Sequence, residues 1–220
     1  MFWSACSARF AYFVDGADRQ IWAASNAIVG HQCATYADPV SSLRYPSPEL
    51  SDGSTRLRRW SLDDLACIEE ASTDSRIPEG TTVPAIYSAD AGRAFIERQW
   101  SRFDNGEGLS LAVSSSVTDT AVGLIVLTLR PQSGVAGIGY WVVPSQRGHG
   151  HASRAVRLTT QWALSSAGLS RVEAWVEPEN SASQQVLTSA GFEHEGTLRS
   201  FLSFPTRRAD AMVFSFVTAP

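Results

Sequence analysis

The pattern of hydrophobic and polar positions becomes regular only at Thr55. From there the segment TRLRRW alternates with the period of a strand. Ser61 and Asp64, three residues apart, have the spacing of a capping box, which predicts a helix that begins at Leu62. The first regular unit of the chain is therefore a strand followed by a helix.

A second helix is predicted after an irregular stretch. Residues 72–87 contain one glycine and two prolines, which interrupt any regular period, so we expect a loop there. Ser88 has the side chain of an N-cap and precedes an amphipathic segment, which predicts a helix over residues 89–103. The order thus continues as loop and helix.

The remainder of the chain predicts a sheet with helices on both of its faces. Apolar or alternating runs separated by turn signals predict an antiparallel meander at residues 109–116, 121–130 and 137–144. Further helices are predicted at 153–168 and 181–191, a buried strand at 171–178, and two last strands at 196–204 and 210–217. This order is typical of a single α+β (mixed α/β) domain.

Composition and length agree with one large domain and an appendage. The chain has 220 residues, of which 44% are hydrophobic and 10% aromatic, enough for a sizeable core. Residues 1–53 show no clear period and end in a polar, Pro-containing stretch. We interpret residues 1–53 as an N-terminal extension or linker and residues 54–220 as the folded domain.

The charge balance excludes several classes of partner. A net charge of −4 and an isoelectric point near 5.6 argue against broad attraction to nucleic acid or to an anionic membrane surface. No apolar run approaches the length of a membrane helix, so we expect a soluble protein, and the cysteine pattern favours the reduced cytosol, which makes a cytoplasmic location the expectation. Cys6, Cys33 and Cys67 are odd in number and widely spaced, which predicts neither a disulfide framework nor a metal site.

The sharpest local chemical signal is the segment RGHGHA at residues 147–152, between a predicted strand and a predicted helix. Glycines allow its backbone N–H groups to point into a common concavity, and the positive end of the following helix favours an anion. Arg147 adds a guanidinium. A tight turn would need glycine for steric reasons alone. A nucleotide-binding loop is a further alternative, but the chain has no G-x-x-x-x-G-K-[ST] segment.

Three more motifs accompany this loop in a fixed order. A Tyr-Trp strand precedes it, the segment VEPENSAS at residues 176–183 follows it, and GFEHEG ends the series at residues 191–196. Together the four resemble the GNAT superfamily of N-acetyltransferases over about Thr55 to Val217, and within it the RimJ/RimL-like branch. The resemblance implies the GNAT fold, in which a central, mostly antiparallel mixed sheet is flanked by helices on both faces.

The resemblance also implies which residues bind acetyl-CoA as co-substrate. The pyrophosphate is expected on the loop, and the pantetheine arm along the strand before it. The implied cofactor-binding residues are Trp141, Val142, Val143, Arg147, Gly148, His149, Gly150, His151, Ala152, Ser153, Asn180 and Ser183. His149 stands where relatives usually carry Lys or Arg, which replaces a permanent charge by one that is mostly absent at neutral pH.

Catalytic roles are implied less completely. Asn180 and Ser183 stand at a predicted helix start, where one can cap the helix while the other faces the ligand; in similar enzymes the Asn contacts pantetheine and the Ser protonates the departing thiolate. The sequence does not nominate a general base. Glu79 is the first candidate, with a solvated loop carboxylate as its alternative interpretation. Glu195 is expected to pair with Arg199.

The predicted activity is transfer of an acetyl group to a primary amine, either a protein N-terminus or a small molecule, by direct attack in a ternary complex. A non-catalytic acyl-CoA-binding regulatory module is the alternative, because it would keep the loop without a working base. The edge of the predicted meander is a surface through which this fold often forms homodimers, so a homodimer is one expected assembly.

Overall fold

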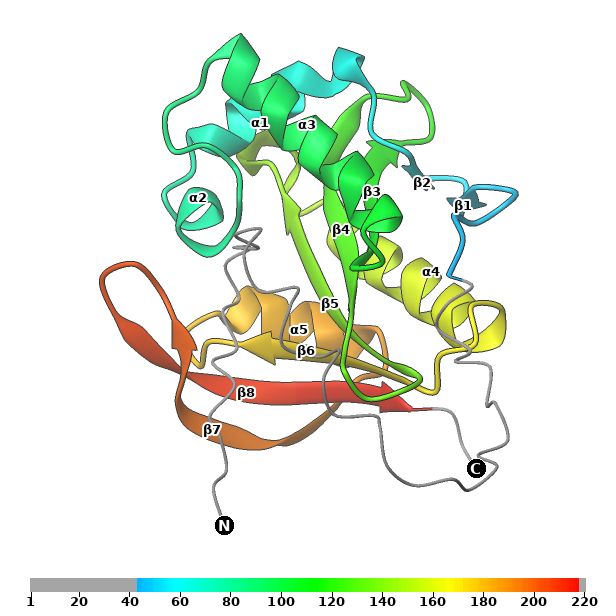
Figure 1. Ribbon diagram of the computed structural model, residues 1–220, viewed down its shortest axis with the longest axis vertical. Helices are drawn as coiled ribbons and strands as arrows, with labels where there is room; N and C mark the ends of the chain where they lie inside the picture. Colours follow the sequence, from blue (N-terminus) through cyan, green and yellow to red (C-terminus); the bar gives the residue numbers. More distant parts are fainter. Residues whose placement is uncertain (1–42, 218–220) are drawn as a thin grey trace, which may run out of the picture.

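The computed structural model describes residues 43–217, which form one eight-stranded sheet with helices packed on it (Figure 1). The strand order is β1-β2-β3-β4-β5-β6-β8-β7. The strands are β1 (Leu50–Ser51), β2 (Thr55–Arg58), β3 (Gly108–Ser115), β4 (Ala121–Leu129), β5 (Val135–Val142), β6 (Arg171–Val176), β7 (Glu193–Ser203) and β8 (Arg208–Val217). The α-helices are α1 (Leu65–Ser72), α2 (Arg76–Gly80), α3 (Ala89–Asp104), α4 (His151–Ser165) and α5 (Ser181–Ser189).

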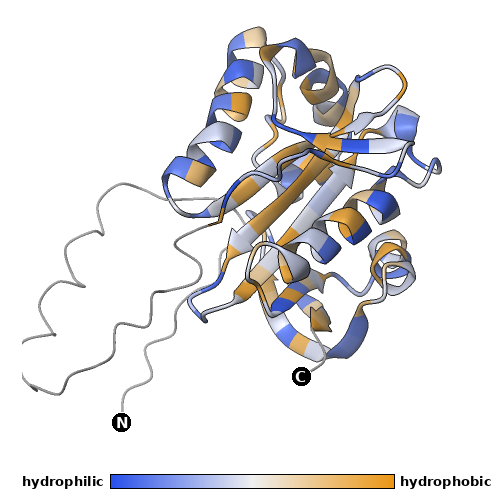
Figure 2. Ribbon diagram, turned by 90° about the vertical axis from the view of Figure 1, so that its right-hand side faces the viewer, coloured by the Kyte–Doolittle hydropathy of each residue, from blue (hydrophilic) through white to orange (hydrophobic). Residues whose placement is uncertain are grey.

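This architecture confirms the predicted α+β fold. Among the described strands, only β5 and β6 pair in parallel, and every other neighbouring pair is antiparallel. Helix α3 packs on β3, whereas α4 packs on β5 and β6 and also contacts α5. Seven successive residues of β4 are buried, because both faces of that strand are covered. Figure 2 shows the resulting hydrophobic colour along the central strands.

Local capping explains where the helices begin. The Ser61–Asp64 capping box forms as predicted, although the first turn, Leu62–Asp64, is a 3-10 helix that leads into α1. Ser88 accepts a hydrogen bond from the Ala91 N–H at the start of α3. In both places the side-chain oxygen satisfies an N–H group that has no partner within its own helix.

The predicted loop over residues 72–87 was partly wrong, because it contains α2. One carboxylate oxygen of Asp74 accepts hydrogen bonds from the N–H groups of Arg76 (2.8 Å) and Ile77 (3.0 Å). Pro78 lies within the first turn, where its missing N–H costs no helical bond. The proline that we took as a breaker is therefore compatible with this short helix.

The ordered domain includes residues 43–53, which the sequence pattern assigned to the extension. Strand β1 pairs with β2, and the Leu43 side chain is buried. Asp52 accepts hydrogen bonds from the Thr55 and Ser54 N–H groups, and its carboxylate lies 3.4 Å from Nε of Arg154 on α4. Residues 1–42 of the predicted extension lie outside the described residues.

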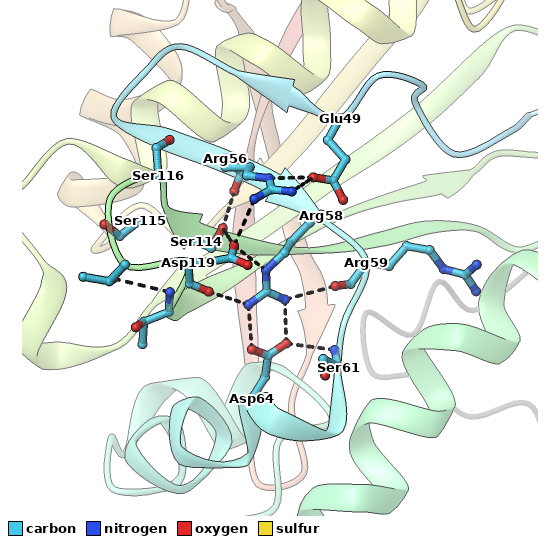
Figure 3. A network of polar contacts seen from close by, with 12 residues as sticks. Glu49, Arg56, Arg58, Arg59, Ser61, Asp64, Ser114, Ser115, Ser116 and Asp119 are labelled. Carbon is cyan, nitrogen blue, oxygen red and sulfur yellow. Dashed lines mark hydrogen bonds and ion pairs between the residues drawn. The ribbon is translucent and has the colours of Figure 1, made fainter.

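A largely buried ion pair fastens β2 to the 3-10 turn that leads into α1 (Figure 3). The Arg58 guanidinium donates two hydrogen bonds of 2.8 Å to the Asp64 carboxylate, which also accepts the Ser61 N–H of the capping box. Arg58 further contacts Asp119, in the turn between β3 and β4. Hydrogen bonding to Asp64 raises the pKa of Arg58 further. This network fixes the edge of the sheet beside the first helix.

Candidate functional site

The parallel strands β5 and β6 pair over only three positions and then separate. The paired residues run from Val135 with Arg171 to Gly137 with Glu173. Beyond them the two strands diverge, as Figure 1 shows, and leave a wedge between their carboxyl ends. A cleft of about 1110 Å³ lies between the separated strands and is lined by residues of both. A gap in the middle of a sheet exposes main-chain hydrogen-bonding groups that a ligand can satisfy.

The predicted phosphate loop lies at this cleft, between β5 and α4. Gly148 (φ +80°) and Gly150 (φ +78°) adopt left-handed conformations, which glycine reaches without strain. Gly150 caps α4 without a side chain, and the first backbone bond of that helix runs from the Arg154 N–H to Gly150 O (3.1 Å). The N–H groups that precede Arg154 have no intrahelical partner and are available to an anion.

Arg147 is the cation of this loop, and its guanidinium is already held in place. Its Nε donates to the carbonyl oxygen of Val142 (3.1 Å), and Nη2 lies 2.8 Å from the Asp74 carboxylate. About half of the side chain is exposed (51%). Gly148, Gly150, His151, Ala152 and Ser153 line the cleft together with Arg147.

The two loop histidines have different surroundings. The His151 side chain is buried, and its Nδ1 lies 2.9 Å from the hydroxyl of Thr55, while the residue is also part of the cleft lining. Burial, followed by the charge of Arg154, lowers the pKa of His151. The His149 side chain is exposed and is not part of the cleft lining, while its carbonyl accepts a hydrogen bond from Arg154 (2.6 Å).

One edge of the strand segment Trp141–Val143 pairs with no other described strand, and Arg147 occupies only the Val142 carbonyl there. The Val143 N–H donates to Val122 O of β4 (2.9 Å). Because successive N–H groups of a strand point to opposite edges, the Val142 N–H faces the wedge. The Trp141 ring is buried against the rings of Trp60 and Phe95. Trp141 and Val142 line the cleft, whereas the buried Val143 does not.

Asn180 and Ser183 face the same cleft from the start of α5. The Asn180 side chain is the helix cap, since its Oδ1 accepts the Ser183 N–H at 3.1 Å. The Ser183 carbonyl accepts a hydrogen bond from the Tyr140 hydroxyl of β5 (3.1 Å). Burial raises the pKa of Tyr140. The tyrosine thus joins the two sides of the wedge where their backbones have separated.

Glu79 also lines the cleft, from α2, and is held in an ion cluster that the sequence did not reveal. Its carboxylate lies 3.1 Å from Nε of Arg207, in the turn between β7 and β8. Arg207 also contacts Glu177, directly after β6, at 2.5 Å. The one available signal was the position of Glu177 at the end of a predicted buried strand, where side chains often reach a site.

Glu195 was assigned the wrong partner. It forms a two-pronged ion pair with Arg171 (2.6 and 2.7 Å) and accepts the Ser215 hydroxyl, instead of contacting Arg199. Arg171 first, and then Ser215, lower the pKa of Glu195 to about 2. Glu195 thereby links β7 to β8 and β6, because Ser215 lies on β8 and Arg171 lies on β6.

A match to a known protein family covers the part of the chain that forms this cleft. Residues 55–193 match the family described as the acetyltransferase (GNAT) domain. The chain belongs to the GNAT acetyltransferase family. The GNAT match includes the wedge, the glycine loop and α5, and it ends at the first residue of β7.

Individual proteins resemble this chain over most of its length, either in sequence or in fold. The uncharacterised N-acetyltransferase p20 of Bacillus licheniformis is 28% identical over 162 residues, 73% of this chain and 91% of p20. RimJ of Mycobacterium smegmatis, solved in complex with CoA-disulfide, superimposes with a TM-score of 0.67 at 23% identity, over 77% of this chain and 86% of RimJ. The ribosomal-protein-S5-alanine acetyltransferase of Vibrio fischeri gives 0.63 at 18%, over 77% and 96%.

The protein is therefore an acetyltransferase enzyme of the GNAT fold. Within residues 43–217, no group of three or more His, Cys, Asp or Glu side chains is placed to hold a metal ion. In the same part of the chain, no helix has the length and apolar character needed to span a membrane. Burial raises the pKa of the Cys67 thiol in α1, which makes this cysteine a structural residue.

Proposed function

We propose that this GNAT enzyme transfers an acetyl group from acetyl-CoA to a primary amine by direct attack in a ternary complex. The observation that carries the proposal is the wedge between β5 and β6, with a glycine loop and a helix start at the same cleft. We place the enzyme in the RimJ/RimL-like branch of the family. Its fold likeness to RimJ and to a ribosomal-protein acetyltransferase supports that placement. The acceptor is then a protein N-terminus or a small-molecule amine.

The loop and the free strand edge suit the two ends of acetyl-CoA. The backbone N–H groups of residues 148–153, with the Arg147 guanidinium, are expected to hold the pyrophosphate. The pantetheine arm is expected along Trp141 and Val142, because that edge of β5 has no neighbouring strand beyond Gly137. The Val143 side chain would contribute only packing, because it does not line the cleft.

Acetyl transfer forms a bond between the amine nitrogen and the carbonyl carbon and breaks the bond from that carbon to sulfur. Negative charge develops on the carbonyl oxygen, where a fixed donor such as the Val142 N–H contributes about 3 kcal/mol. We assign Ser183 to protonate the departing thiolate and Asn180 to contact the pantetheine. Glu79 is the proposed base for the ammonium proton, and Arg207 must release its carboxylate before it can act.

Calorimetric titration with acetyl-CoA tests the proposal, followed by thiol release with a panel of peptides and amines. The Arg147→Ala/Gly150→Trp double variant should lose binding, whereas Arg93→Ala, which removes an exposed side chain of α3, should keep it. Binding with turnover on some acceptor supports the enzyme. Binding without turnover favours a regulatory module, and no binding by the intact protein overturns the proposal.

A further inference from the structure

Arg207 lies in surroundings that suit any compact cation. Two carboxylates, from Glu79 and Glu177, contact its guanidinium, and the ring of Phe204 lies 4.1 Å from its Cζ. Carboxylates and an aromatic face are the groups that bind ammonium and guanidinium ions. We call Glu79, Glu177, Phe204 and Arg207 the acidic rim. All four line the cleft that contains the glycine loop, and together they carry one net negative charge.

The guanidinium of Arg207 is placed so that it can be displaced. Its side chain is 39% exposed, and those of Glu79 and Glu177 are 34% and 22% exposed. Ion pairs at this level of exposure contribute little to stability because water screens them. The backbone of the turn is closed by the Phe204 N–H, which donates to Arg207 O at 2.8 Å. The long side chain can therefore swing away while the turn keeps its shape.

We propose that the acidic rim binds a positive charge of the acceptor, and that Arg207 fills this place until the acceptor arrives. The inference rests on the proposed function and names its substrate class: an amine that carries a second cationic group, as a diamine or a basic peptide does. The reacting amine must be neutral to attack, so Glu177 and Phe204 hold the second charge once Arg207 has moved away, while Glu79 accepts the proton of the reacting amine. An acceptor whose second group is a carboxylate is repelled, because the carboxylates of the rim outnumber its guanidinium.

Three acceptors of matched length test this charge preference: pentylamine, 1,5-diaminopentane and 5-aminopentanoate. Their second ends are neutral, cationic and anionic. With saturating acetyl-CoA, we expect kcat/KM for the diamine to exceed that for pentylamine about tenfold. Glu177→Gln should bring the ratio close to one. Arg207→Gln should raise kcat/KM for the diamine, because the internal competitor is gone.

Arg208→Gln is the matched control. Arg208 is the next residue of the hairpin, and its guanidinium bonds to Ser200 O (2.8 Å) instead of the rim. This variant should keep the wild-type ratio. Thermal unfolding with each acceptor adds a readout that needs no turnover: the diamine should stabilise the wild-type protein more than pentylamine does, and should no longer do so in Glu177→Gln.

The outcomes separate the two proposals. Turnover without diamine preference, or a preference that Glu177→Gln leaves intact, overturns the acidic rim as a cation site while the acetyltransferase stands. Stabilisation by the diamine that depends on Glu177, without turnover on any amine, supports the rim and counts against the proposed function. If Arg207→Gln lowers the diamine rate and thermal stability together, Arg207 is a structural clasp and the inference fails.

Discussion

The left-handed conformation of Gly148 offers a direct test of the phosphate loop. Its φ is +80°, and no atom lies within 4 Å of the position that a Cβ would take, so Gly148→Ala introduces backbone strain without a clash. That strain is about 1–2 kcal/mol for an L-residue in this region. If the free loop relaxes to relieve this strain and must return to the left-handed conformation to bind acetyl-CoA, the affinity should fall about 5- to 30-fold.

Gly106 provides a control with the same local cost. It has φ +69° in the turn between α3 and β3, again with no atom within 4 Å of a Cβ, and it does not line the cleft. We expect Gly106→Ala to lose about 1–2 kcal/mol of stability and to keep its affinity for acetyl-CoA. In Gly148→Ala the same strain is divided: the part that the free loop bears lowers its thermal stability, and the part that it relieves by relaxing lowers its affinity in calorimetric titration. If Gly148→Ala loses neither stability nor affinity, the loop does not need this conformation, and the proposed role of its N–H groups is wrong.

Three further predictions concern stability. Burial lowers the pKa of His151 below its ordinary 6.5, so the unfolded chain binds more protons at this residue than the folded protein does. The stability of the fold should therefore decrease as the pH drops below about 6.5. His151→Gln, which can still bond to Thr55, should flatten this pH dependence in thermal unfolding. Asp64→Ala should cost near the lower end of about 3–5 kcal/mol in denaturant unfolding, because Arg58 stays buried and keeps only its other carboxylate. Tyr140→Phe should cost about 1 kcal/mol and weaken acetyl-CoA binding, because its hydroxyl bond crosses the wedge.

The sequence predicted elements whose cause is local. The Ser61–Asp64 capping box and the Ser88 cap depend on residues within one turn, and both form as expected. Helix α2 was missed although its cap is also local, because Asp74 acts from two and three residues before the N–H groups it binds and a proline follows. An Asp at that spacing is a weaker sequence signal for the start of a helix than a Ser-x-x-Asp capping box is.

Side-chain partners were predicted less well than backbone features. Glu195 was expected to pair with an arginine four residues away, yet its partner Arg171 is 24 residues distant and becomes a neighbour only through the strand order. The His151 ring turned inward for the same reason, since Thr55 lies 96 residues earlier in the chain. Such contacts depend on the sheet topology, which periodicity alone does not specify.

The glycine-loop end of the cleft is a local backbone feature, whereas the acidic-rim end consists of side chains that are distant in the sequence. This difference affects how the enzyme could choose its acceptor. The proposed anion end would use backbone N–H groups, which a short glycine motif can indicate. The acidic rim joins side chains 128 and 30 residues apart, Arg207 with Glu79 and with Glu177, and no local pattern records that meeting. Relatives that keep the glycine motif can therefore exchange the rim charges without altering the fold, because these ion pairs are exposed and stabilise it little. If the rim selects the acceptor, swapping its charges should change the preferred amine while leaving acetyl-CoA affinity unaltered, and a parallel loss of both would show that the two ends are not independent.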